Sequence, residues 1–147
     1  MRIIKFRAKS VDTNEWVYGF YYIFPTAETF IQTFIGYNHR DEPYFRSIPV
    51  IHETVGQFTG FVDRPESTVY NELYEHDYVS YYDNSGQYQK GEILFVDGKW
   101  KVRCFDGDDE GNQDIELSEG VKRYIGNRFD GIRRDLDDRP RTSHQNA

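Results

Sequence analysis

The chain has 147 residues, a formal net charge of −7 and an aromatic content of 17%. This length predicts a single domain with a core of its own, and the many aromatic residues favour strands. The negative charge argues against nucleic-acid binding, and no apolar run approaches the roughly 20 residues that a membrane helix needs. Cys104 is the only cysteine, which excludes an internal disulfide and fits a reducing, intracellular setting.

Three strands are predicted in the first part of the chain. The segment IIKFRAK (residues 3–9) alternates apolar and basic side chains, as a strand with two different faces does. WVYGFYYIF (residues 16–24) follows a polar turn and ends at Pro25, which predicts a hairpin with the first strand. A third strand is predicted in ETFIQTFIGY (residues 28–37), and residues 38–47 are predicted to form a polar loop.

The rest of the chain adds short strands separated by turns. A helical turn is predicted at residues 71–74, and a strand begins at Tyr78. Asp97 and Gly98 form a dipeptide that tight hairpins favour, so the runs on either side of it are predicted to pair. A last short strand precedes a polar segment at residues 137–147, which we expect to be a flexible C-terminal tail.

Short strands, tight turns and almost no helix are typical of a barrel or a sandwich. We therefore expect a mainly β fold with little helix, in which an SH3-like barrel carries additional N-terminal β-strands. The segment that is expected to form the barrel carries the acidic excess, because residues 71–130 hold 14 Asp and Glu against 7 Lys and Arg.

Five segments, read in order, carry a family resemblance. They are IKFRA, VGQFTGFVD, LYEHDYV, GEILFVDGKWKV and YIGN, which begin at residues 4, 55, 73, 91 and 124. Together they resemble the YopX family of small proteins, which are encoded mainly by bacteriophages and prophages. The resemblance implies a mostly β protein with an SH3-like barrel in the bacterial cytoplasm, and it implies no established activity.

The resemblance also implies a domain organisation. One YopX-like domain is expected over residues 1–136, with the N-terminal strands at 1–65 and the barrel at about 66–130. His76 stands where the family has a glycine in the turn before a strand, so the backbone is expected to differ locally there.

The segment TVGQFTGFVDRP raises the question of a phosphate-binding loop, because Gly56 and Gly60 lie four residues apart. Such a loop needs a lysine and a Ser or Thr after its last glycine, followed by a helix. Here Phe61 follows Gly60, no helical pattern follows, and Asp63 would repel a phosphate. We therefore predict that both glycines hold backbone bends between the N-terminal strands and the barrel, with Phe58 buried.

The acidic loop at residues 106–117 partly matches a calcium-binding loop. Asp106, Asp108 and Glu110 occupy positions one, three and five, but Leu117 stands at position twelve, where the template has a bidentate Glu. A solvated acidic loop is the favoured interpretation, and no metal ligand is assigned.

No enzyme motif occurs in the sequence. The four histidines lie far apart, and Cys104 lies in a strand-like run that has no nucleophile signature. The chain is therefore expected not to be an enzyme and to need no cofactor. An enzyme would require a pocket that gathers His52 or His76 with carboxylates.

Two groups of residues are candidates for partner binding. Lys5, Arg7 and Lys9 share one face of the first predicted strand, where they could contact phosphates or an acidic partner. The favoured interpretation is that these cations protect an edge strand from aggregation.

The second group consists of tyrosines around the turn at residues 83–86, where Tyr81, Tyr82 and Tyr88 are candidate contacts. Alternation along a strand requires some of these rings to face the core, and exposed ones would support a partner site.

These features favour a non-enzymatic phage or prophage accessory protein that binds another protein, from the phage or its host. The alternative is a nucleic-acid-associated regulator that uses the N-terminal basic strand and exposed tyrosines. A homo-oligomer is compatible with either function.

Overall fold

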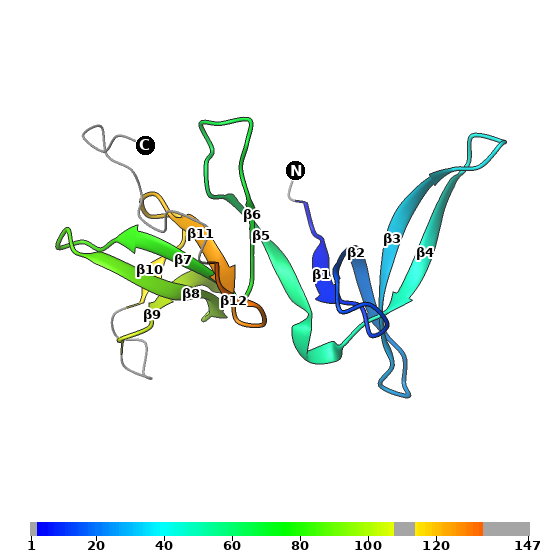
Figure 1. Ribbon diagram of the computed structural model, residues 1–147, viewed down its shortest axis with the longest axis horizontal. Coiled ribbons are helices and arrows are strands. Elements are labelled where there is room, and N and C mark those ends of the chain that lie inside the picture. The colour runs from blue at the N-terminus through cyan, green and yellow to red at the C-terminus, as the bar shows by residue number, and fades with distance from the viewer. Residues whose placement is uncertain (1–2, 108–113, 134–147) are drawn as a thin grey trace. The chain divides into compact units, whose positions relative to one another are not determined.

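A computed structural model describes residues 3–107 and 114–133. The chain divides into two compact units, Met1–Phe58 and Thr59–Ala147. The single YopX-like domain over residues 1–136, with its division at residue 65, stays a prediction. The described residues form twelve β-strands and a single 3-10 turn (Figure 1). The prediction of a mainly β fold with little helix is therefore confirmed.

The strands of the first unit follow one another through short turns. They are β1 (Phe6–Lys9), β2 (Trp16–Ile23), β3 (Thr29–Tyr37) and β4 (Pro43–Pro49), followed by the 3-10 turn η1 (His52–Thr54) and by β5 (Gly56–Val62), which continues into the second unit. Neighbouring strands are antiparallel, in the order β4-β3-β2-β1-β5-β6. The predicted hairpin between the first two strands is confirmed, with Arg7 opposite Tyr18.

Part of the segment that was predicted to be a polar loop, residues 38–47, forms strand β4 instead. This strand pairs with β3 over most of its length, for example Thr33 with Arg46 and Phe34 with Phe45. Residues 38–42 form a turn as predicted, but residues 43–47 are extended. Pro43 and Pro49 border β4, and proline normally signals a break. Proline is tolerated in an edge strand, and β4 is the outermost strand of its sheet.

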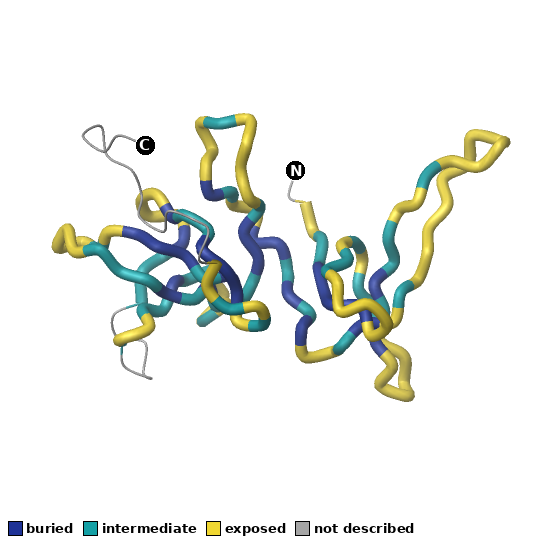
Figure 2. Tube along the Cα trace, viewed as in Figure 1, coloured by how far each residue is buried: buried dark blue, intermediate teal, exposed yellow. Residues whose placement is uncertain are grey.

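The core of the first unit is small and lies on one face of its sheet. Ala8, Ile31 and Val50 are buried together, and Tyr21 and Ile48 are among the half-buried side chains that pack against them. The register places Tyr21, Ile31 and Ile48 side by side across β2, β3 and β4, so this face is the inner one. Figure 2 shows the contrast with β4, most of which is exposed.

The second unit contains a six-stranded antiparallel sheet in the order β10-β9-β8-β7-β11-β12. Its strands and the preceding β6 are β6 (Glu72–Tyr74), β7 (Asp77–Tyr82), β8 (Tyr88–Val96), β9 (Lys99–Cys104), β10 (Ile115–Glu116), β11 (Arg123–Asn127) and β12 (Gly131–Ile132). The helical turn predicted at residues 71–74 is wrong, because β6 is extended and belongs to the first sheet. Closure of this unit into an SH3-like barrel remains a prediction.

The turn between β8 and β9 confirms the hairpin predicted at Asp97 and Gly98. Both residues have positive φ, 51° and 77°, as a tight two-residue hairpin requires. His76 also has a positive φ, 71°, so it adopts a backbone conformation that favours glycine.

The glycine prediction is half confirmed. Gly60 has φ +88°, the left-handed conformation of a bend, and Phe58 is buried as expected. Gly56 is different, because it lies in β5 and pairs with Arg7 as part of an extended strand. The segment is thus a strand with one bend near its end.

Two sequence-based expectations fall partly or wholly on parts of the chain outside the described residues. Half of the acidic loop lies at residues 108–113, outside the described residues, and the tail at 137–147 also lies outside. Over residues 3–107 and 114–133, no helix is both long and apolar enough to cross a membrane.

Candidate functional site

The predicted basic stripe lies on a central strand, because β1 is flanked by β2 and β5. The interpretation as protection of an edge strand is therefore wrong. Arg7 and Lys9 are only 4% and 8% exposed, and their cationic groups lie 4.3 and 5.4 Å from the centre of the Trp16 ring. Lys5 stacks over Phe58 at 4.9 Å. These cations are used in contacts with aromatic rings, where attraction to the ring face offsets part of their desolvation.

The predicted tyrosines separate into different environments. Tyr81 is 2% exposed and belongs to the core of the second unit. Tyr82 is exposed, Tyr88 is half-buried, and their rings contact each other across β7 and β8 at 6.0 Å. Alternation explains the split, since Tyr81 and Tyr82 are consecutive in one strand and face opposite sides.

A larger aromatic surface lies on the outer face of strands β2, β3 and β4. The register places Tyr22 opposite Phe30 and Phe34 opposite Phe45, and opposite residues of paired strands share a face. We define the aromatic face by the following side chains, which lie on this side or contact it: Tyr18, Phe20, Tyr22, Phe24, Phe30, Phe34, Tyr37 and Phe45.

Rings of the aromatic face contact one another and remain open to solvent. Tyr22 stacks on Phe30 at 5.3 Å, and Phe34 meets Phe45 edge-on at 5.9 Å. Phe20, Phe34 and Phe45 are 58%, 51% and 45% exposed. Soluble monomers rarely leave contiguous apolar patches of this kind uncovered unless they have a binding role.

Strands β2, β3 and β4 place no charged side chain on the aromatic face, and Arg7 of β1, which lies opposite Tyr18 on the same side, is buried. Arg46 is the only charged residue within β2, β3 and β4, and its pairing with Thr33 places it on the inner face. Gln32 and Ser47 supply polar groups in the middle of the aromatic face, opposite each other. Aromatic enrichment with charge depletion is the composition of a protein–protein interface core.

Comparison with models of known families shows the family of this chain. The family model described as "YopX protein" matches residues 5–131, which is most of the chain. The chain belongs to the YopX family. This confirms the resemblance carried by the five sequence segments. No curated protein and no solved structure matches this YopX family member.

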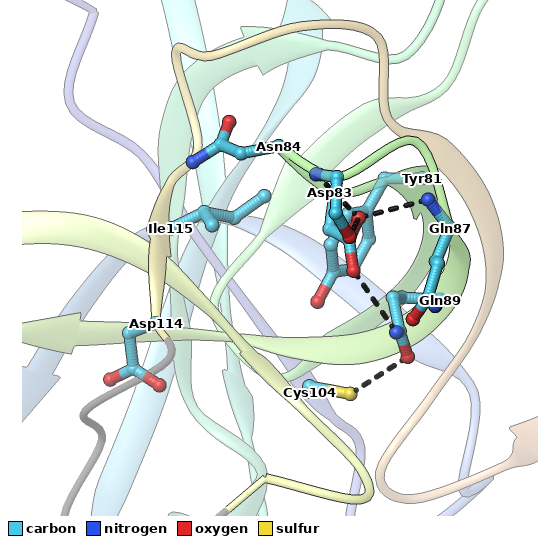
Figure 3. A pocket seen from close by; sticks show the side chains of 9 residues that line it. Tyr81, Asp83, Asn84, Gln87, Gln89, Cys104, Asp114 and Ile115 are labelled. Carbon is cyan, nitrogen blue, oxygen red and sulfur yellow. Dashed lines mark hydrogen bonds between the residues drawn. The ribbon is translucent and has the colours of Figure 1, made fainter.

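The second unit of this YopX family member has a polar hollow of about 490 Å³ beside the turn at residues 83–87. Figure 3 shows Asp83 bonded to the turn and to Gln89, which in turn accepts a bond from Cys104. Burial, followed by the neighbouring Cys104, raises the pKa of Tyr81, so its phenol stays protonated. The polar groups of the hollow are thus bonded mainly to one another.

The histidines named for a possible enzyme lie elsewhere. His52 Nδ1 is 3.1 Å from the hydroxyl of Thr29, and His76 Nδ1 is 2.8 Å from Glu92, which also pairs with Arg128. Neither histidine lines the polar hollow. In residues 3–107 and 114–133, no cluster of three His, Cys, Asp or Glu side chains could hold a metal ion.

Sequence reasoning named tyrosines in the second unit and missed the aromatic face in the first. The signal was present, because Tyr18, Phe20, Tyr22 and Phe24 alternate along one segment. Both faces of that strand are apolar, however, so the pattern alone does not show which one the core covers.

Proposed function

We propose that this YopX family member is a non-enzymatic accessory protein of phage or prophage origin that acts in the bacterial cytoplasm by binding another protein. The binding surface is the aromatic face of β2, β3 and β4. Its partner presents an apolar surface, because strands β2, β3 and β4 place no charged side chain on this side and a partner's charges would lose hydration there. Arg7 and Lys9 of β1 lie on the same side, but they are buried beside Trp16.

One observation carries this proposal: the uncharged, exposed aromatic rings that lie side by side on β2, β3 and β4. Aromatic side chains are enriched among the residues that contribute most to binding. The face also lies over a sheet with a small core, so burying it would add the second layer that a stable sheet usually has.

The nucleic-acid alternative has less support. Phosphate binding needs accessible cations, and Arg7 and Lys9 are buried next to Trp16. Binding of the purified protein to DNA or RNA at low salt, measured by fluorescence anisotropy, would favour the alternative.

The test removes the rings and asks which proteins are still captured. A triple variant, Phe20→Ser with Phe34→Ser and Phe45→Ser, is compared with the wild-type protein in affinity capture from host lysate, quantified by mass spectrometry. We expect a partner whose recovery survives high salt and falls at least about tenfold in the triple variant, because buried aromatic residues contribute about 2 kcal/mol or more each at binding hot spots.

A matched control replaces two exposed valines outside the aromatic face, Val11→Ser with Val69→Ser, and is expected to leave capture unchanged. Light scattering on the purified wild-type protein detects a second copy as the partner. A monomeric protein that captures the same set of proteins with and without the three rings would overturn the proposal.

A further inference from the structure

The second unit contains a further cavity, of about 260 Å³, where the end of β5 meets the segment that precedes β11. Most of its wall is apolar and consists of Phe61, Val62, Pro65, Leu73, Leu117 and Val121. Two of its lining residues are glycines, Gly60 and Gly120, and a methyl group placed on either would meet no atom within 4 Å. The space next to both glycines is therefore open.

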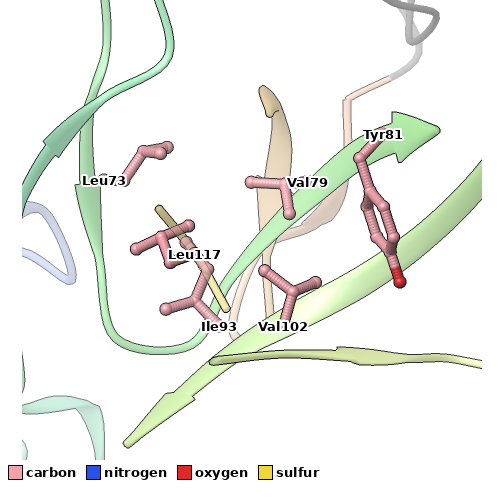
Figure 4. Close-up of a cluster of buried hydrophobic side chains, with 6 residues drawn as sticks. All are labelled: Leu73, Val79, Tyr81, Ile93, Val102 and Leu117. Atoms are coloured by element: carbon pink, nitrogen blue, oxygen red, sulfur yellow. The ribbon is translucent and has the colours of Figure 1, made fainter. Parts of the chain in front are cut away.

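Lys122 is the only cation among the described lining residues, and it is 4% exposed. Its ammonium lies 5.9 Å from the centre of the Tyr81 ring, and Tyr81 belongs to the same core cluster as Leu73 and Leu117 (Figure 4). In the part of the chain that the structure describes, Lys122 makes no hydrogen bond or ion pair. An ammonium on so little-exposed a side chain, without either contact, is costly in free energy. Its nitrogen is not among the fully buried side-chain atoms that lack a partner, so a ligand can still reach it.

Burial lowers the pKa of Lys122 to about 8, and the negative charge of Glu119 acts in the opposite direction as the smaller effect. Lys122 is therefore still mostly protonated at neutral pH, and it would gain free energy from a counter-ion.

Asp63 lines the same cavity but is already satisfied. Its carboxylate accepts bonds from the backbone and side-chain amides of Asn71 at 2.7 and 3.0 Å and from the Tyr124 amide at 3.3 Å. These contacts hold Asp63 in a structural role at the ends of β5 and β11. Its negative charge opposes the binding of any anion, and it opposes a ligand with two negative charges more strongly than a ligand with one.

We propose that this cavity binds a monocarboxylate with a small apolar body, and that the Lys122 ammonium is its counter-ion. The carboxylate would supply the missing acceptor at Lys122, and the apolar body would lie against Phe61, Leu73 and Leu117. Such a group can come from a free small acid or from the C-terminal residue of a polypeptide.

The size of the cavity limits the ligand. About 260 Å³ holds about nine water molecules at roughly 30 Å³ each, so a compact ring with one carboxylate fits. Benzoate is a suitable probe, and benzamide has the same shape without the charge.

The experiment is a ¹H–¹⁵N NMR titration of the full chain with benzoate and with benzamide. We expect benzoate to shift the amide signals of Gly60, Gly120 and Lys122, and to bind at least about tenfold more tightly than benzamide, because a hydrogen bond to a charged group contributes about 1.5–3 kcal/mol. A parallel arm uses a short peptide that ends in Phe, with a free or an amidated C-terminus. Tighter binding of the free-acid peptide than of benzoate would identify a polypeptide end as the source, and the reverse would identify a free acid.

Two variants connect the effect to Lys122. Lys122→Met keeps the length of the side chain and removes the charge, so it should abolish the preference for benzoate over benzamide. Lys99→Met removes an exposed lysine that pairs with Glu116, and it should leave the preference intact. Equal binding of benzoate and benzamide to the wild-type protein, or no binding of either, would overturn the proposal without affecting the aromatic face.

Discussion

At the scale of the residue, the second unit buries two ionisable side chains, Lys122 and Asp63. The Lys122 ammonium lies against the Tyr81 ring. The carboxylate of Asp63 accepts hydrogen bonds from three amide groups. The unfolded chain hydrates the ammonium more fully than the folded chain does. Folding therefore costs free energy for as long as Lys122 is protonated.

This cost predicts a pH dependence of stability. The pKa of Lys122 is about 8 in the folded protein and 10.5 at its ordinary value, so the unfolded state binds more protons between these values, and stability rises with pH. Its contribution to the free energy of unfolding should increase by roughly 1–2 kcal/mol between pH 8 and 9.5, because one pKa unit corresponds to about 1.4 kcal/mol. Urea unfolding at both pH values measures the change.

Comparison with Lys122→Met isolates this effect from the titration of other groups, Tyr81 among them. The variant should be more stable than the wild-type protein at pH 7 and should lack the rise attributed to Lys122. Parallel pH profiles for the two proteins would show that the amine is hydrated in the folded state.

At the scale of the element, the hairpin of β8 and β9 depends on two residues. Asp97 and Gly98 connect Val96 to Lys99, which are the last pair of the ladder. Both turn residues need positive φ, which suits the right-handed twist of the two strands.

Replacement of Gly98 by Ala should lower the free energy of unfolding by about 1–2 kcal/mol, because a side chain at positive φ is strained. No atom lies within 4 Å of the added methyl group, so the cost comes from the backbone alone. Asp97→Gly in the same turn is the control and should not destabilise the protein. Chemical denaturation measures both variants, and an unchanged midpoint for Gly98→Ala would contradict the predicted strain.

At the scale of the whole molecule, the two units differ in core and in charge. In the described residues, the first unit buries three hydrophobic residues in its cluster and the second buries six. Residues 1–58 hold six Lys and Arg and six Asp and Glu, whereas residues 59–147 hold 12 and 19. The net charge of the chain therefore belongs to the second unit, and the aromatic face belongs to the neutral one.

This difference predicts two unfolding transitions. Each unit contains one tryptophan, Trp16 in the first and Trp100 in the second, so the variants Trp100→Phe and Trp16→Phe each leave a reporter in one unit. The Trp16 signal should change at a lower urea concentration than the Trp100 signal, because less apolar area is buried around it. Coincident midpoints in the two variants would show a single cooperative unit.

The amino-acid sequence by itself determined the mainly β fold, the hairpin at Asp97 and Gly98, the burial of Phe58 and the membership of the YopX family. These features rest on local signals: alternation, turn residues and the order of short motifs. Local signals also exclude a phosphate loop at Gly60, where the bend leads into a strand end and a cavity wall.

Only the tertiary structure decided which of two apolar faces is covered. Alternation shows that Tyr18 and Phe20 share a face, but covering that face requires another layer from elsewhere in the chain or from a partner. The same reason explains Arg7 and Lys9, whose burial depends on β1 lying between β2 and β5. From the sequence alone, Lys122 would likewise be taken for a surface residue. Its contact with Tyr81 appears only in the folded structure, because burial depends on contacts between distant segments.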